Sequence, residues 1–291
     1  MSRRHELTTR IDALQDVHGI LDAMQSLAMV EVSRITAFIE AQRAALELVE
    51  TVVDDFLGDR PLPSAEIAGD LVIAFGAERG FCGDFNPRIA GELERQLGAT
   101  GRPASLVLVG TGLAGSWQGI EPMVLPGPGV AEEVPGVLQR LTDTVAGLLP
   151  AGRDAPATGL LLVAHDASGI RVRRLLPLQR PPRPRSRFPL RLNLPPARFG
   201  TLLTEQYLYA LLHAALYDSL LEENRRRADH MESALHRLGE RLETLHRQRN
   251  RERQEEITEE IEILMLSLEA EQPAQTPPPE HVVLLTSGPP T

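Results

Sequence analysis

The chain has 291 residues and carries 30 arginines and no lysine against 40 acidic residues, for a formal net charge of −10. That acidic balance argues against a general nucleic-acid binder, and the single cysteine excludes an internal disulfide and a cysteine-built metal site. No apolar run approaches the roughly 18 residues of a membrane span, and no signal peptide is visible, so we expect no direct membrane span.

The first 60 residues predict one long helix. Residues 3–57 contain no proline and a single glycine. Apolar residues recur at about every 3.5 positions, which is the seam spacing of a coiled coil. They are Leu7, Ile11, Leu14, Leu21, Met24, Ala28, Ile35, Phe38, Leu46, Val49, Val53 and Phe56. The glycine and prolines of residues 58–63 end the helix.

The middle of the chain predicts an α/β domain over residues 61–196. Short apolar strands are expected at 70–75, 105–109 and 159–164, with a hairpin partner at 170–178 and helices at 86–97 and 130–149. Strands that alternate with helices indicate an open, mostly parallel, Rossmann-like sheet. The end of this region, residues 180–196, is rich in proline and arginine and is interpreted as a linker.

A second long helix is predicted over residues 197–272. Its apolar stripe runs from Leu203 to Leu245, but residues 246–256 contain no apolar side chain, so that segment cannot form a coiled-coil seam. Ile257, Ile261, Leu264 and Leu268 then restore an apolar face. The proline-rich residues 273–291 are expected to be a disordered tail.

The predicted fold class is therefore α/β, with a long antiparallel coiled coil of the N- and C-terminal helices and an inserted Rossmann-like α/β domain. The coiled-coil shaft is discontinuous in sequence, made by residues 1–60 and 197–272. Two long helices of this kind bury their stripes most economically against each other.

One motif suggests a different class of protein. Residues 110–115 follow a strand and fit G-x-G-x-x-G, which would make the chain an α/β nucleotide-binding enzyme with a coiled-coil dimerisation arm. The motif follows the second predicted strand and no acidic residue ends the next one. The loop at 76–83 lacks the lysine and hydroxyl residue of a P-loop. Histidines on the C-terminal helix do not share a face, so we expect no metal site.

Three stretches resemble the gamma subunit of F-type ATP synthases. Glu6-Leu7, Arg10-Ile11, Gln15, Ile20 and Ala23-Met24 are similar to the opening helix of that family. Residues 78–86 are similar to its Asp-Arg-Gly-Leu-Cys-Gly-x-Leu-Asn loop, matched here by Arg79, Gly80, Cys82, Gly83 and Asn86. Asn250, Arg253-Gln254 and Ile257-Thr258-x-Glu260 match its Asn-Lys-x-Arg-Gln-x-x-Ile-Thr-x-Glu signature without a gap.

The resemblance implies a non-catalytic central-stalk rotor without a cofactor, which couples ion flow through the membrane sector to conformational change at the catalytic sites. The partners implied are the alpha and beta subunits of the hexamer, the epsilon subunit and the ring of c subunits. The location implied is the periphery of a bacterial cell membrane, on its cytoplasmic side. Subunit contacts are carried over onto Met24, Arg227, Arg253, Gln254, Thr258 and Glu260.

The sequence also departs from the family. Gly19 and Asp22 stand where basic residues are usual, and Glu31 replaces a frequent lysine. We therefore hypothesise a divergent branch, or a specialised or sodium-coupled ATPase.

Overall fold

The computed structural model describes residues 3–59, 67–100, 102, 104–149, 157–178 and 191–271. The predicted tail and most of the predicted linker lie outside these residues. Contacts divide the chain into two compact units, Val17–Arg237 and Met1–Asp16 with Leu238–Thr291, and each is described by itself. Helices α1 (Arg3–Asp59) and α5 (Pro196–Glu271) have a segment in both units. The predicted division into a shaft and an inserted domain stays a prediction.

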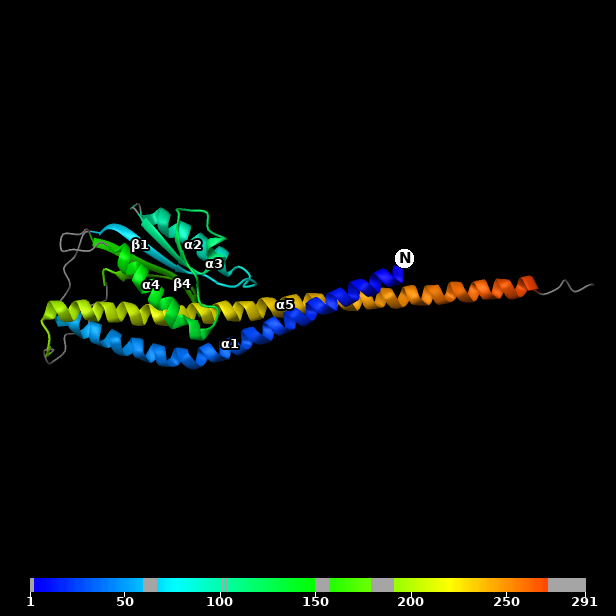
Figure 1. Ribbon diagram of the computed structural model, residues 1–291, viewed down its shortest axis with the longest axis horizontal. Helices are drawn as coiled ribbons and strands as arrows, with labels where there is room; N and C mark the ends of the chain where they lie inside the picture. Colours follow the sequence, from blue (N-terminus) through cyan, green and yellow to red (C-terminus); the bar gives the residue numbers. More distant parts are fainter. Residues whose placement is uncertain are drawn as a thin grey trace, which may run out of the picture. The chain divides into compact units, whose positions relative to one another are not determined.

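The larger unit contains a five-stranded sheet in the order β3-β2-β1-β4-β5 (Figure 1). Its strands are β1 (Ile67–Phe75), β2 (Ala104–Val109), β3 (Met123–Leu125), β4 (Ala157–Asp166) and β5 (Gly169–Leu176). Neighbours are parallel except β4 and β5, which form an antiparallel hairpin. The predicted mostly parallel sheet and its hairpin are confirmed.

Alternating strand residues supply two cores, one on each face of the sheet. Val72 and Ala74 of β1 pack with α2 (Phe85–Thr100) and α3 (Thr111–Ala114). Leu71, Ile73 and Phe75 pack on the opposite face with the short helix η1 (Ala131–Glu133), α4 (Val134–Leu148), α1 and α5. Figure 1 shows the two helical layers on either side of the strands.

Helix α5 lies between α1 and the sheet in this unit. Seven of its residues join the core that contains Ile35 of α1 and Ile73 of β1: Tyr207, Leu211, Leu212, Leu216, Tyr217, Leu220 and Leu221. The predicted seam with the N-terminal helix accounts for part of the buried surface of this stretch, and the sheet covers the rest. A helix with two apolar neighbours needs a wider buried arc than the seam of a two-stranded coiled coil.

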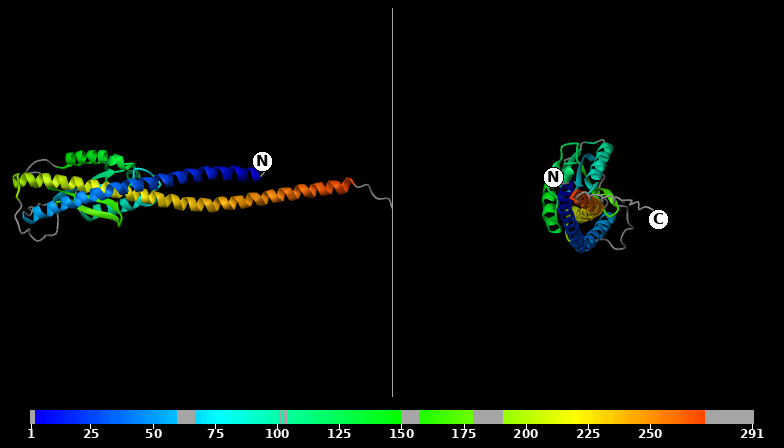
Figure 2. Two further views of the ribbon diagram at one scale, coloured as in Figure 1. Left: turned by 90° about the horizontal axis from the view of Figure 1, so that it is seen from below. Right: turned by 90° about the vertical axis from the view of Figure 1, so that its right-hand side faces the viewer.

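The smaller unit is an antiparallel pair formed by the start of α1 and the end of α5 (Figure 2). Ile11 and Leu245 are fully buried in it. Arg3 pairs with Glu252 at 3.4 Å and Arg4 with Glu256 at 3.1 Å. Among the described residues, no helix combines the length and apolarity needed to cross a membrane.

Candidate subunit-contact surfaces

The loop between β1 and α2 contains four of the five residues predicted from the family loop, and the fifth, Asn86, is the second residue of α2. The Asn86 side chain accepts a hydrogen bond from the Ala77 backbone N–H at 2.8 Å and so closes the loop. Phe81 has φ 66° and Gly83 has φ 59°. Glycine adopts this left-handed region readily, but a bulky aromatic residue does so rarely. The loop therefore holds the Phe81 side chain exposed in a conformation that its surroundings must maintain.

Glu78 binds the turn that carries the G-x-G-x-x-G motif. Its carboxylate accepts hydrogen bonds from the Thr111 N–H at 2.9 Å, the Thr111 hydroxyl at 3.0 Å and the Gly127 N–H at 2.7 Å. Helix α3, which begins there, has only four residues. In a dinucleotide site, such backbone N–H groups would point at a pyrophosphate. Here a carboxylate already occupies them and would repel a second anion.

Arg227 of α5 fastens the β1–α2 loop to the helix. Its guanidinium donates to the Gly80 carbonyl at 3.2 Å, the Arg79 carbonyl at 3.4 Å and the Cys82 Sγ at 3.3 Å. It also donates to Asn224 Oδ1 at 2.8 Å and forms an ion pair with Glu223. With 6% of its surface exposed, Arg227 directs its donors into its own chain. Its contact with a beta subunit stays a prediction.

The charges under this loop are strongly desolvated. Burial raises the pKa of Glu223, opposed by the Arg227 guanidinium and by hydrogen bonds from the backbone of Arg79 and Glu78. Burial, with the Glu223 carboxylate second, raises the pKa of Cys82 to about 12. The thiol is therefore protonated at neutral pH and is a poor nucleophile, as expected for a small buried core residue.

We call these residues the loop clamp: Arg79, Gly80, Cys82, Glu223, Asn224 and Arg227. The family resemblance includes the loop, Glu223 and Arg227 as separate positions, but it does not join them into one contact, and Asn224 is not among its positions. The available signal was a Glu and an Arg four residues apart on one helix face. At the rim of the clamp, Arg226 pairs with Asp84 at 2.8 Å.

The second candidate surface is the polar segment of α5 in the smaller unit. Arg253, Gln254, Thr258 and Glu260 are all exposed. The Thr258 hydroxyl donates to the Gln254 carbonyl at 2.9 Å, whereas Arg253 forms no ion pair with any described residue. Together, these four residues offer free donors and acceptors on a helix. We call residues 246–260 the polar belt.

Beyond the polar belt, exposed apolar side chains point in all directions around the helix, with the exposed Glu262 among them. Ile257 is an exposed apolar residue within the belt, and five more follow the belt closely: Ile261, Ile263, Leu264, Met265 and Leu266. The sequence analysis predicts an apolar face here. The structure shows more than a face, because residues 263 to 266 are consecutive and therefore point around the whole circumference of the helix. The sixth predicted contact, Met24, lies half-buried on α1 in the larger unit.

The N-terminal arginines are a further feature that the sequence comparison missed. Arg3 and Arg4 pair with Glu252 and Glu256, which lie within the polar belt. The basic residues at the start of α1 and the acidic residues near the end of α5 are visible in the sequence. Because the two helices are antiparallel, these opposite charges could have been predicted to lie side by side.

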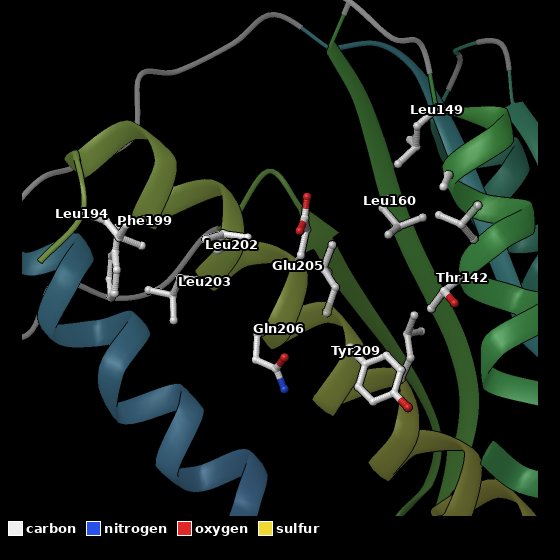
Figure 3. A pocket seen from close by; sticks show the side chains of 14 residues that line it. Thr142, Leu149, Leu160, Leu194, Phe199, Leu202, Leu203, Glu205, Gln206 and Tyr209 are labelled. Atoms are coloured by element: carbon white, nitrogen blue, oxygen red, sulfur yellow. The ribbon is translucent and has the colours of Figure 1, made fainter.

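An apolar cavity of roughly 700 Å³ lies in the larger unit between α4, β4 and the first turns of α5 (Figure 3). Leu149, Leu160, Leu203 and Phe199 line it, with Glu205 as its charged member. No cluster of three potential metal ligands occurs among the described residues. The lining of the cavity is mainly apolar.

Taken together, these features define an α/β domain built on two long antiparallel helices, one of which carries exposed polar and apolar surfaces. The sequence matches the ATP synthase family over residues 3–131 and 163–270. It is 28% identical to the ATP synthase gamma chain of Saccharopolyspora erythraea, covering 93% of this chain and 98% of the relative. It is 27% identical to that of Frankia casuarinae, covering 88% and 93%.

Solved structures share the fold. A chain in the Euglena gracilis mitochondrial ATP synthase OSCP/F1/c-ring structure aligns with a TM-score of 0.58 at 13% identity, over 96% of this chain and 99% of that chain. One from the Tetrahymena thermophila central stalk/c-ring aligns with a TM-score of 0.53 at 16% identity, over 74% and 99%. The chain belongs to the ATP synthase family. Within that family it is of the gamma type, the rotor of the central stalk.

Proposed function

We propose that this rotor works mechanically, without bond chemistry of its own, by turning inside a hexamer of alpha and beta subunits. Its partners toward the membrane are the epsilon subunit and the c-ring. Ion flow through the membrane sector drives the rotation, and the rotor imposes different conformations on the catalytic sites. The complex lies at the periphery of a bacterial cell membrane, on the cytoplasmic side.

The polar belt is the observation that carries this proposal. A rotor contact has to form and break at every step, and exposed charged hydrogen bonds can exchange partners. Arg253 presents a fork of donors that suits carboxylates and carbonyls, and Gln254 adds both a donor and an acceptor. Buried, interlocked apolar knobs would hold one fixed partner instead.

The loop clamp supports the same function from inside the larger unit. Torque applied to the α/β domain reaches the shaft only if the domain is fixed to α5. Arg227 bonds the β1–α2 loop to α5 through backbone carbonyls, and a buried ion pair holds Arg227 in place. These bonds supplement the apolar core that α5 shares with the sheet.

The alternative function, an α/β nucleotide-binding enzyme, is disfavoured by Glu78. The N–H groups of Thr111 and Gly127 are bound to its carboxylate. Titration with NAD followed by thermal shift separates the two functions. The rotor should show no shift, whereas a clear upward shift would support nucleotide binding.

The decisive experiment changes the polar belt in the assembled complex. Arg253→Ala with Gln254→Ala should lower the ATPase and synthesis rates of a complex with the alpha and beta subunits of the same organism. The isolated chain should keep its thermal unfolding midpoint, because both side chains are exposed. Arg95→Ala is the matched control, since Arg95 is an exposed arginine on α2 paired only locally with Glu92. Unchanged turnover in the double variant would remove these residues from the contact surface.

A further inference from the structure

The first residue of η1 is bonded to both long helices. The Ala131 N–H donates to the Glu31 carboxylate of α1 at 2.6 Å. The Ala131 carbonyl accepts a hydrogen bond from the Tyr217 hydroxyl of α5 at 3.5 Å. All three residues are buried, Glu31 included, with 7% of its surface exposed. One residue of the α/β region therefore joins α1 and α5, and we call these three residues the η1 junction.

Glu31 supplies a cap that the η1 segment lacks in its own sequence. Val130 precedes η1 and provides no side-chain hydrogen bond to it, so the first N–H of the helix needs an acceptor from elsewhere. A carboxylate 100 positions earlier in the chain fills that place. Because η1 leads directly into α4, the negative charge also interacts favourably with the positive end of the helix dipole.

The η1 junction constrains the larger unit in a way that its apolar core does not. Ile35 and Ile39 of α1 share a core with Val134 and Leu138 of α4, but apolar burial is non-directional. A hydrogen bond weakens steeply away from its preferred distance and angle, and a bond to a charged group is stronger than a neutral one. The junction therefore fixes the position of α4 on α1 more sharply than packing alone.

The loop clamp and the η1 junction fasten the α/β region at two separate places. The clamp bonds the β1–α2 loop to α5 through Arg227, and the junction bonds the start of η1 to α1 through Glu31. A body that is held at one point can turn about that point, and a second attachment on another element removes this freedom.

We infer that Glu31 is a positioning residue of the rotor, which carries torque from the α/β region into the N-terminal helix. This inference rests on the proposed function. It adds the path by which torque reaches α1, whereas the loop clamp serves α5.

The test removes the Glu31–Ala131 bond without leaving a buried group unpaired. Glu31→Leu alone would leave the Ala131 N–H without its acceptor, which is destabilising. Ala131→Pro deletes that N–H, and proline is tolerated in the first turn of a helix. Val130 already has the extended backbone that suits a residue before proline, with φ −144° and ψ 162°. Because replacement of both partners by apolar groups can be nearly neutral, the double variant should keep the original thermal unfolding midpoint.

Two rates separate positioning from folding. The hexamer acts on the long helices directly, so the ATPase rate of an alpha–beta–rotor complex without the membrane sector should be the same for the double variant and the original. Ion-driven ATP synthesis by the whole complex in vesicles has to pass torque through the α/β region. It should fall by about tenfold, the factor by which loss of one hydrogen bond to a charged group reduces the population of the coupled geometry.

Two single variants serve as controls. Glu31→Gln is the conservative change, since its amide oxygen can still accept a hydrogen bond from the Ala131 N–H, and it should retain most of the synthesis rate. Glu40→Leu is the matched control, because Glu40 is exposed on the same helix and undergoes the same change of side chain as Glu31→Leu. It should retain both rates.

The outcomes distinguish this inference from the function beneath it. Normal synthesis by the double variant would overturn the inference. An equal loss of the ATPase rate, a lowered unfolding midpoint or the same loss in Glu40→Leu would also overturn it, because the effect would then lie in folding or assembly. If the unmodified chain failed to assemble with the hexamer, the proposed function itself would fail.

Discussion

The loop clamp and the polar belt use the same residue type for opposite purposes. Arg227 is buried and its donors are bound to backbone carbonyls, an amide and a carboxylate of its own chain. Arg253 is exposed and forms no ion pair with any described residue. Both belong to one uninterrupted helix. The difference teaches that burial, and not the side chain alone, determines whether an arginine in this protein fixes a structure or is available to a partner.

The strongest test of that contrast is Arg227→Ala. Removal of one partner of a buried ion pair leaves an uncompensated charge and typically costs about 3–5 kcal/mol, so the larger unit should lose roughly that much unfolding free energy. Arg253→Ala should change it by less than about 0.5 kcal/mol, as surface substitutions usually do. Urea unfolding of both variants measures the difference. Similar losses for the two would contradict the distinction.

A pH titration tests whether burial also determines the charge of a second side chain in the larger unit. His165 is buried against Phe85, and burial lowers its pKa from 6.5 to about 4. The folded state thus favours the neutral ring. The contribution of this shift to the unfolding free energy is fully present above pH 6.5. It decreases by about 3 kcal/mol as the pH falls toward 4.

The comparison variant is His165→Phe, which keeps a ring in contact with Phe85 and removes the titration. Its unfolding free energy should decrease less between pH 6.5 and 4 than that of the original chain. Parallel curves for the two proteins would show that His165 does not contribute to the pH dependence.

The smallest expected effect concerns the exposed charges. Arg4 pairs with Glu256 at 3.1 Å, but half of its side chain is exposed. Such pairs contribute roughly 0.2–1 kcal/mol and less in high salt. Arg4→Ala should therefore shift the thermal midpoint only slightly at low salt and not at high salt. A large, salt-independent loss would mean that the arginine stem packs in the helix pair.

The helix and strand positions were predictable because each has its own sequence period. The C-terminal helix was expected over 197–272 and is observed over Pro196–Glu271. The polar belt was also recognisable, since the loss of the apolar stripe is itself a local pattern. A specialised or sodium-coupled ATPase stays a hypothesis.

The loop clamp was not predictable in the same way. Gly80 and Arg227 are 147 positions apart in the chain, and no period in the sequence links them. Phe38 shows the same limit on a smaller scale. It fits the coiled-coil spacing and its ring stacks on Tyr217 of α5, yet 46% of it is exposed, while its neighbour Ile39 is buried.

The apolar end of α5 has a consequence for rotation. A side chain on one face of a helix gives an interaction energy that rises and falls as the helix turns. From Ile263 to Leu266 the exposed apolar residues surround the helix, so the energy of these four residues in a smooth apolar collar would be nearly the same at every angle. The end of the shaft would then hold its axis in place without adding angular minima, and the resting positions of the rotor would be set elsewhere along its length.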